Sequence, residues 1–291
     1  MKNIGYKMHL ILPEHPIDPV TIKVLQQVDK VSQGLGIKYF VVGATARDLV
    51  LTHVFGMPVR RVTTDLDFAI SVNDWSQFEL IKNCLIQQQG FSASSEMRQR
   101  LYFATNTSAL GVPLDLVPFG GIENPANTVA WPPDLEIMMN VTGYSDVYAA
   151  SVGIQIAPDL VIRVASLAGL VIMKLFAWKE RGRSNPKDAQ DIYSILQSYA
   201  NAGNCDRIYD QDPDLLGSVE YNPDLAGAKL LGRDVIQISN KETQRQLIDL
   251  LKDESEMNRL LADMVGRNSY HEDAIDKADK YLSLFCQELR K

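Results

Sequence analysis

Cysteine and histidine are scarce in this chain of 291 residues, which contains three cysteines and four histidines. The cysteines are odd in number, lie far apart, and have no histidine at a spacing typical of metal ligands. The sequence therefore argues against a disulfide framework and against a zinc site. We interpret three residues as reduced thiols without a chemical role: Cys84, Cys205 and Cys286.

Long hydrophobic runs are also missing. No N-terminal segment combines a basic start, an apolar run and a small-residue cleavage site, and no apolar stretch approaches the length of a membrane span. We therefore expect a cytoplasmic protein without a membrane partner. Hydrophobic residues still make up 46% of the chain, an ordinary share for a globular protein, so a sizeable core can form.

Positive charge is in the minority, because 29 Lys and Arg stand against 36 Asp and Glu, a formal net charge of −7. A protein that grips nucleic acid over its whole surface needs the opposite balance, since Lys and Arg supply most of the non-specific affinity for phosphate. A local basic patch remains possible around Arg60 and Arg61 or within residues 179–187. Arg98 and Arg100 are interpreted as ordinary solvated charges.

The sequence is most informative over residues 39–70, YFVVGATARDLVLTHVFGMPVRRVTTDLDFAI. A helix over residues 20–35 leads into a β-branched and aromatic strand, residues 37–42, and a second helix is expected over residues 46–54. Gly43, Ala44 and Thr45 then form a strand-to-helix turn. Backbone N–H groups at such a turn can hold phosphate, although a tight turn with no ligand is the common alternative.

Two aspartates lie one residue apart in the next predicted strand, residues 65–70. Side chains alternate along a strand, so Asp65 and Asp67 point to one face while Leu66 and Phe68 point to the other. Two neighbouring carboxylates repel each other unless a cation lies between them. The pattern favours a divalent metal site, and the alternative is a solvent-facing edge that carries two acids without a function.

A third carboxylate, Asp115, interrupts the otherwise apolar strand VPLDLVPF, residues 112–119. A lone carboxylate in a hydrophobic strand is costly unless it is paired, protonated or bound to metal. If this strand lies beside the one carrying Asp65 and Asp67, Asp115 joins them in a cluster. The alternative is a buried ion pair with an arginine such as Arg47.

The character of the chain changes from strands to helices near residue 166. We expect residues 101–105 and 112–119 to form a hairpin-like pair, residues 120–134 a loop, and residues 135–164 further strands of the same sheet. Residues 201–239 are turn-rich and should hold one or two short helices at most, before helices at 241–265 and 272–289. The predicted class is α+β, with a mixed-sheet domain at residues 1–165 and a helical domain at residues 166–291.

The helical half contains buried charges. The helix predicted at residues 166–181 is apolar almost all round, yet Lys174 falls on its hydrophobic stripe. In the next helix, Asp188 and Asp191 share the face of the apolar residues. The buried lysine needs an anion, which is either a phosphate or a carboxylate. A ligand role for these three residues and an interhelical salt bridge between Lys174 and Asp191 are both compatible with the pattern.

These motifs together resemble the DNA polymerase beta-like nucleotidyltransferase superfamily, within which VGATARDLVL is similar to the glycine turn of tRNA CCA-adding enzymes. RVTTDLDF, and later KLFAWKER with KDAQDI, are closer to the AbiEii/AbiGii-type nucleotidyltransferases. The resemblance covers residues 37–196. Ala44 departs from the family, which usually has Gly or Ser there, so backbone donors would have to hold the phosphates.

The resemblance implies transfer of a nucleoside monophosphate from a nucleoside triphosphate (NTP) to an acceptor hydroxyl. Asp65, Asp67 and Asp115 would be catalytic and would hold two Mg²⁺ ions, with Mn²⁺ as a substitute. The nucleotide would be bound by Gly43, Ala44, Thr45, Lys174, Asp188 and Asp191.

The family also implies partners: an acceptor that is often tRNA or another RNA, and an antitoxin protein that restrains the enzyme as a toxin. Two other functions remain open. One is nucleotidyl transfer to a small hydroxylated compound such as an aminoglycoside, and the other is a degenerate protein that binds nucleotide or a partner without catalysis. Retention of all three carboxylates argues against the degenerate alternative.

Overall fold

The computed structural model describes residues 7–58, 65–88, 90–106, 111–181, 185–266 and 272–291. The chain divides into two compact units, Met1–Ser166 and Leu167–Lys291. None of the described helices is both long and apolar enough to cross a membrane. The basic positions Arg60, Arg61 and Arg183, considered above, lie outside the described residues.

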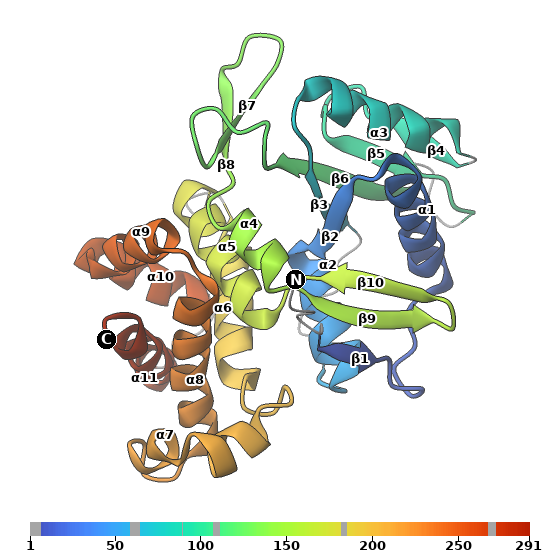
Figure 1. Cartoon of the computed structure of the whole chain (residues 1–291). Helices are drawn as coiled ribbons and strands as arrows, with labels where there is room; N and C mark the ends of the chain where they lie inside the picture. The colour runs from blue at the N-terminus through green and yellow to red at the C-terminus, as the bar shows by residue number, and fades with distance from the viewer. Residues whose placement is uncertain (1–6, 59–64, 89, 107–110, 182–184, 267–271) are drawn as a thin grey trace, which may run out of the picture. The chain divides into compact units, whose positions relative to one another are not determined.

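A mixed sheet of eight strands, in the order β1-β9-β10-β2-β3-β6-β5-β4, forms the first unit (Figure 1). β1 with β9, β10 with β2, and β3 with β6 are parallel, and the other neighbouring pairs are antiparallel. The strands are β1 (Met8–Leu10), β2 (Lys38–Val42), β3 (Leu66–Ser71), β4 (Phe91–Ala93), β5 (Arg100–Phe103), β6 (Val112–Phe119), β9 (Val152–Ala157) and β10 (Leu160–Val164).

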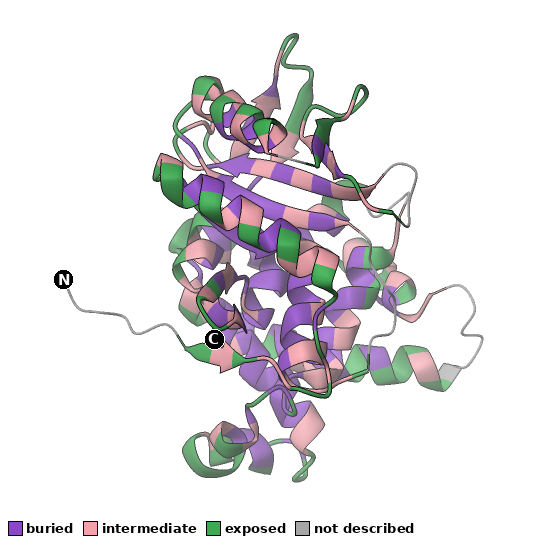
Figure 2. Ribbon diagram, turned by 90° about the vertical axis from the view of Figure 1, so that its right-hand side faces the viewer, coloured by how far each residue is buried: buried purple, intermediate pink, exposed green. Residues whose placement is uncertain are grey.

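The helices of this unit follow local sequence signals. In α1 (Pro19–Leu35), the Asp18 side chain accepts hydrogen bonds from the first-turn N–H groups, and Gly36 ends the helix at φ +65°. Buried residues form one stripe along α1 and exposed residues the other (Figure 2). The remaining helical segments are α2 (Gly43–Asp48), the π-type turn η1 (Leu49–Val54), α3 (Trp75–Gln87) and α4 (Tyr144–Ala149).

The core of the unit lies around the three central strands. Phe40 of β2, Phe68 of β3 and Leu116 of β6 have no exposed surface, which explains the β-branched and aromatic composition of these strands. The predicted pairing of β5 with β6 and the placement of β6 beside β3 are confirmed. Two boundaries move: the helix predicted from residue 46 already begins at Gly43, and Asp65 lies just before β3 rather than inside it.

The segment predicted as a loop, residues 120–134, contains strand β7 (Thr128–Trp131). β7 pairs with β8 (Ile137–Asn140) in a separate two-stranded sheet, so of the strands predicted in residues 135–164 only β9 and β10 extend the main sheet. Trp131 anchors this ribbon by packing its ring against Trp75, with centroids 5.0 Å apart, and against Phe78 at 5.5 Å. The Gly, Pro and Asn residues that predicted a loop flank the short strand.

The second unit is helical throughout its described residues, and with the mixed sheet of the first unit it confirms the predicted α+β class (Figure 1). The helical segments of this unit are α5 (Leu167–Arg181), α6 (Lys187–Ser198), the π-type turn η2 (Arg207–Gln211), α7 (Pro213–Gly217), α8 (Pro223–Ile238), α9 (Lys241–Lys252), α10 (Glu254–Val265) and α11 (Glu272–Leu289). α5 is buried almost all round, including Trp178.

The prediction of short helices at most over residues 201–239 is wrong, because α8 is a full helix of 16 residues. Its glycines are sites of close packing rather than turns. A Cβ at Gly227 would lie 2.7 Å from the backbone nitrogen of Ala200, and a Cβ at Gly232 would lie 2.5 Å from the carbonyl oxygen of Phe285 in α11. Glycine therefore lets α8 approach its neighbours.

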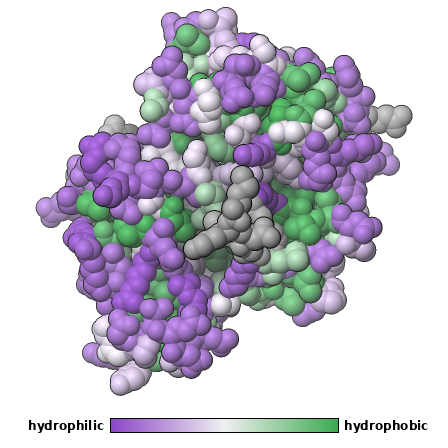
Figure 3. Space-filling view, viewed as in Figure 1, coloured by the Kyte–Doolittle hydropathy of each residue, from purple (hydrophilic) through white to green (hydrophobic). Residues whose placement is uncertain are grey.

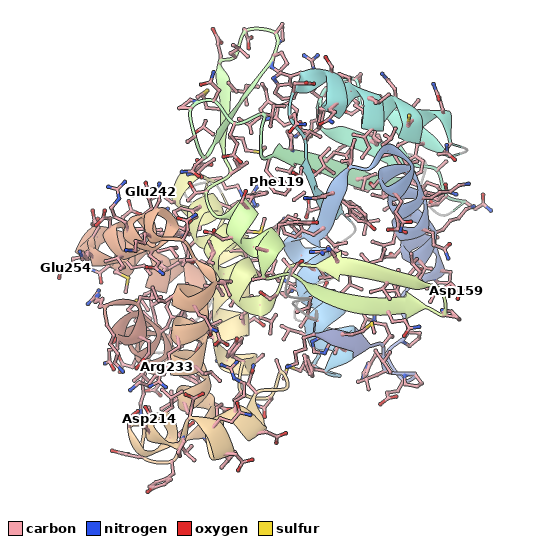
Figure 4. All side chains as sticks on the ribbon, viewed as in Figure 1. Phe119, Asp159, Asp214, Arg233, Glu242 and Glu254 are labelled. Carbon is pink, nitrogen blue, oxygen red and sulfur yellow. The ribbon has the colours of Figure 1, made fainter. Side chains whose placement is uncertain are left out.

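Ion pairs join α7, α8 and α11. Arg233 of α8 is 2.7 Å from Asp214 and 2.9 Å from Glu288, and the Arg233 and Asp214 side chains can be followed in Figure 4.

The helix predicted over residues 241–265 is two helices, because Asp253 caps the first turn of α10 through the N–H of Glu256. The face shown in Figure 3 is mostly hydrophilic with smaller hydrophobic areas between, as the charge content leads one to expect.

Candidate active site

A row of side chains crosses four neighbouring strands of the main sheet. The register pairs Val42 of β2 with Asp67 of β3, Asp67 with Asp115 of β6, and Asp115 with Arg100 of β5. Residues paired across neighbouring strands project from the same face. Asp67 and Asp115, separated by 47 residues in the sequence, therefore stand side by side as predicted.

The glycine turn lies directly against Asp67. Gly43 has φ +66°, and a Cβ at this position would lie 2.0 Å from the Oδ2 atom of Asp67. Only glycine permits both this backbone conformation and this approach. The structure thus brings together Gly43, from the end of β2, and the carboxylate of β3, which the sequence had singled out separately.

Thr45 fixes the position of the other aspartate of the pair. Its Oγ1 atom donates a hydrogen bond of 2.8 Å to the backbone carbonyl oxygen of Asp65. Thr45 and Ala44 are both buried, so their side chains hold the turn together within the fold. Any contact of this turn with phosphate would come from its backbone.

Arg100 is the residue at this site that the sequence interpretation missed. Its Nε atom is 2.7 Å from Oδ1 of Asp115 and its Nη2 atom is 2.6 Å from Oδ2, while the same Nη2 lies 3.6 Å from Oδ2 of Asp65. The interpretation of Arg100 as a solvated charge is therefore wrong. An arginine does pair with Asp115, but it is not Arg47, which forms an ion pair of 2.6 Å with Asp48.

The Asp65 and Asp115 carboxylates differ in their access to solvent. The Asp65 side chain is 44% exposed, whereas those of Asp115 and Arg100 are 16% and 19% exposed. On β3 the neighbours of Asp67 are buried, with Leu66 at 4%, so the predicted alternation of faces holds. The hydrogen bonds to Asp115 raise the pKa of Arg100, despite the opposing effect of burial, and the guanidinium stays charged.

The donor chemistry of this row fits a hard divalent cation, because its oxygens come from carboxylates. Within the described ranges, however, no group of three His, Cys, Asp or Glu side chains is placed to surround one ion. Arg100 occupies both oxygens of Asp115.

The second unit contains the predicted cluster around Lys174. The Lys174 Nζ atom is 2.6 Å from Oδ2 of Asp191 and 3.3 Å from Oδ1 of Asp188, and all three residues are buried. Arg181 adds a contact of 3.0 Å to Asp188. Burial alone would raise the pKa of Asp188, but the charges of Lys174 and Arg181 outweigh it and lower this pKa. The predicted interhelical salt bridge is confirmed.

Comparison with known families identifies the chain. The family model of the nucleotidyl transferase AbiEii toxin, of type IV toxin-antitoxin systems, matches residues 31–277. The chain belongs to this family. The matched region contains the glycine turn, the row of carboxylates and the Lys174 cluster, so the nucleotidyltransferase resemblance drawn from the motifs is confirmed.

Comparison with solved structures gave weak likenesses to nucleotidyltransferases. The antibiotic-resistance factor ANT(2'')-Ia is 11% identical, with a TM-score of 0.37 over 70% of this chain and 99% of its own. A nucleotidyltransferase-like protein from Paracoccidioides brasiliensis is 15% identical, with a TM-score of 0.42 over 71% and 94%. The CCA-adding enzyme of Thermotoga maritima, complexed with tRNA, is 14% identical, with a TM-score of 0.26 over 91% and 70%. No argument is based on likenesses of this size.

Comparison with curated proteins gave no match. The identification of the family therefore rests on the AbiEii family model, and the description of the candidate site rests on the residues of this chain.

Proposed function

We propose that this nucleotidyltransferase moves a nucleoside monophosphate from an NTP to an acceptor hydroxyl at the face formed by Asp65, Asp67 and Asp115. The observation that carries the proposal is the approach of Gly43 to Asp67, with a virtual Cβ only 2.0 Å from the carboxylate oxygen. This approach supports the proposal, because backbone N–H groups that could bind phosphate would lie next to an acidic side chain. Nucleotidyl transfer needs both, because its catalysis consists mostly of positioning and charge neutralisation.

Mg²⁺ is the proposed cofactor, with Mn²⁺ as a substitute. Asp65 and Asp67 would hold two ions, and Asp115 would join them, since the carboxylates provide the hard oxygen ligands that these metals prefer. The bound metal would neutralise charge on the triphosphate and activate the attacking oxygen. Asp115 would accept or orient the proton of the acceptor hydroxyl. The turn at Gly43, Ala44 and Thr45 would hold the leaving phosphates through backbone N–H groups.

Contact of Lys174, Asp188 and Asp191 with the nucleotide stays a prediction from sequence. The salt bridge already gives the buried lysine its anions. A nucleotide role predicts that Lys174→Gln weakens NTP affinity in a variant that remains folded, whereas a structural role alone predicts lower stability with unchanged affinity. Isothermal titration of the NTP against both proteins separates the two.

Thermal unfolding tests the donor and metal parts of the proposal. A ligand that binds only the folded state raises the unfolding midpoint. We expect one of the four NTPs to raise the midpoint of the wild type in the presence of Mg²⁺, and expect this shift to disappear in Asp67→Asn. If no NTP shifts the wild type at millimolar concentration, the degenerate, non-catalytic alternative replaces this proposal.

For the acceptor we propose RNA, tRNA in particular, on the strength of the family. An aminoglycoside-like small molecule is the second candidate, favoured by the net charge of −7, which disfavours broad contact with nucleic acid. Incubation of the enzyme and an α-labelled NTP with total cellular RNA and, separately, with a panel of aminoglycosides decides between them. Label in the RNA supports the first candidate, and label in the small molecule alone supports the second.

The family name also leads us to propose that the chain acts as the toxin of a toxin-antitoxin pair. Induced expression in a bacterial host should then arrest growth, and Asp67→Asn at equal expression should not. A catalytically dead variant that is as toxic as the wild type would contradict a toxicity based on nucleotidyl transfer.

A further inference from the structure

We propose that Arg100 acts as a built-in cation that holds Asp115 in the metal-free protein and must release it before a divalent ion can bind there. The inference rests on the proposed function. It assigns to Arg100 a positioning role for the third carboxylate, which neither the motifs nor the family match assigns.

The first step of the argument is the geometry of the ion pair. Nε and Nη2 of Arg100 meet the two oxygens of Asp115 at 2.7 Å and 2.6 Å. A guanidinium and a carboxylate that are joined by two parallel bonds form the strongest common type of charged hydrogen bond. Both oxygens through which Asp115 could bind a metal are therefore already engaged.

The second step is that Arg100 also reaches the neighbouring carboxylate. Its Nη2 atom lies 3.6 Å from Oδ2 of Asp65. One guanidinium thus lies within ion-pair distance of two members of the cluster that would otherwise repel each other.

The third step is that Arg100 is held there by the sheet. It is the first residue of β5 and is in register with Asp115 on β6, and its side chain is only 19% exposed. The partner of Asp115 is thus fixed by strand pairing, unlike a mobile arginine on the surface.

The consequence is competition between the arginine and a metal ion for Asp115. Any ion that uses Asp115 must first break the bidentate pair, and that cost weakens the observed affinity. Removal of the guanidinium should therefore tighten metal binding while it destabilises the metal-free protein. A residue with a purely structural role would change stability without tightening metal binding.

Titration calorimetry with Mn²⁺ tests this directly on the full chain. We expect Arg100→Gln to bind Mn²⁺ about tenfold more tightly than the wild type, which corresponds to the loss of one competing interaction. The unfolding midpoint without metal should fall, and addition of Mn²⁺ should raise it by more than in the wild type. Arg100→Lys, which keeps the charge but cannot form the two-bond pair, should bind with intermediate affinity and covers the case that the glutamine variant does not fold.

The matched control is Arg98→Gln, which removes the same charge two residues away. Arg98 contacts Glu79 at 3.4 Å and the carbonyl oxygen of Pro132 at 2.9 Å, and it has no contact with the carboxylate row among those described. Its Mn²⁺ affinity should equal that of the wild type. If Arg98→Gln tightens binding as much as Arg100→Gln, the effect is one of overall charge and the inference is wrong.

Asp67→Asn separates failure of this inference from failure of the proposed function. If the wild type binds Mn²⁺ and Asp67→Asn does not, the metal site stands, and unchanged or weaker binding by Arg100→Gln then overturns the inference alone. If neither the wild type nor either Arg100 variant binds Mn²⁺, the proposed metal site fails and the inference fails with it.

Discussion

At the scale of single residues, the site depends on two close approaches that the composition of the chain cannot show. Gly43 faces Asp67 across a space that no Cβ can enter, and Arg100 binds Asp115 from the neighbouring strand. The carboxylates themselves were predictable as site residues, because an acidic side chain in an apolar strand is costly unless it has a partner or a ligand. Arg100 was not, since its partnership depends on the register of β5 against β6, and a charged residue at the start of a short strand reads as a surface position.

Gly43→Ala is the residue-scale prediction. The new methyl group would overlap the Asp67 carboxylate and would force an L-residue into φ +66°, so we expect a loss of stability of about 1–2 kcal/mol and a loss of nucleotidyl transfer of about a hundredfold or more, since a small misplacement of a reacting group is costly. Urea unfolding and transfer of label from an NTP measure the two effects.

Gly34→Ala is the control for this substitution. Gly34 lies inside α1 with no atom within 4 Å of its virtual Cβ, so alanine there should leave activity unchanged and raise stability slightly, by up to about 1 kcal/mol. Equal activity of the two alanine variants would show that the approach of Gly43 to Asp67 does not matter for function.

At the scale of elements, the helical spacing of apolar residues predicted helices whose ends also carry capping residues. The prediction failed where glycines lie inside a helix and allow close packing instead of marking a turn. α1 was expected close to its observed bounds because its apolar residues recur at helical spacing and Gly36 follows its last residue. The prediction failed for α8, where Gly227 and Gly232 permit close packing that only the three-dimensional structure reveals. The short strands β1, β4 and β7 carried too few residues for a period to show.

Gly227→Ala tests this explanation of α8. In an exposed helix the change would be stabilising, but here the Cβ would lie 2.7 Å from the backbone nitrogen of Ala200. We therefore expect a loss of stability of about 1–3 kcal/mol in urea unfolding. Gly217→Ala is the control, because its virtual Cβ has no atom within 4 Å. If Gly227→Ala were as stable as the wild type, the close approach of Gly227 to Ala200 would not matter for the packing of α8.

The ion pairs of Lys174 between helices α5 and α6 predict that the free energy of unfolding depends on pH. The pKa of Asp188 is lower in the folded protein than its ordinary value of 3.8, so its ionised form stabilises the fold above about pH 4. This contribution is lost as the pH falls through the folded pKa. Asp188→Asn should therefore cost about 1–3 kcal/mol at pH 7, and its difference from the wild type should shrink below pH 3.8.

Urea unfolding of both proteins from pH 7 down to pH 3 measures this difference. Asp249→Asn serves as the control, because Asp249 is 60% exposed and only 3.9 Å from Lys252, and such pairs contribute little. A difference between Asp188→Asn and the wild type that stays constant across this range would contradict the assigned ion pairing.

At the scale of the whole molecule, the sequence places the change from strands to helices near residue 166, and the chain divides into its two compact units after Ser166. The family model spans both units. Fold class and family were predictable because the acidic and glycine motifs occur in order along the chain. The acceptor was not predictable, because no motif in the sequence specifies it and the net charge of −7 restricts it only weakly.

The most direct test of the central claim is the rate of transfer of label from an α-labelled NTP to the acceptor, measured for the wild type, Asp67→Asn and Asp159→Asn. Asp159 is an exposed acid in the turn between β9 and β10 (Figure 4) and controls for the loss of one negative charge. We predict a loss of roughly a thousandfold in Asp67→Asn, with its circular dichroism unchanged, and full activity in Asp159→Asn. Near-normal transfer by a folded Asp67→Asn would contradict the assignment of the active site to this row of the sheet.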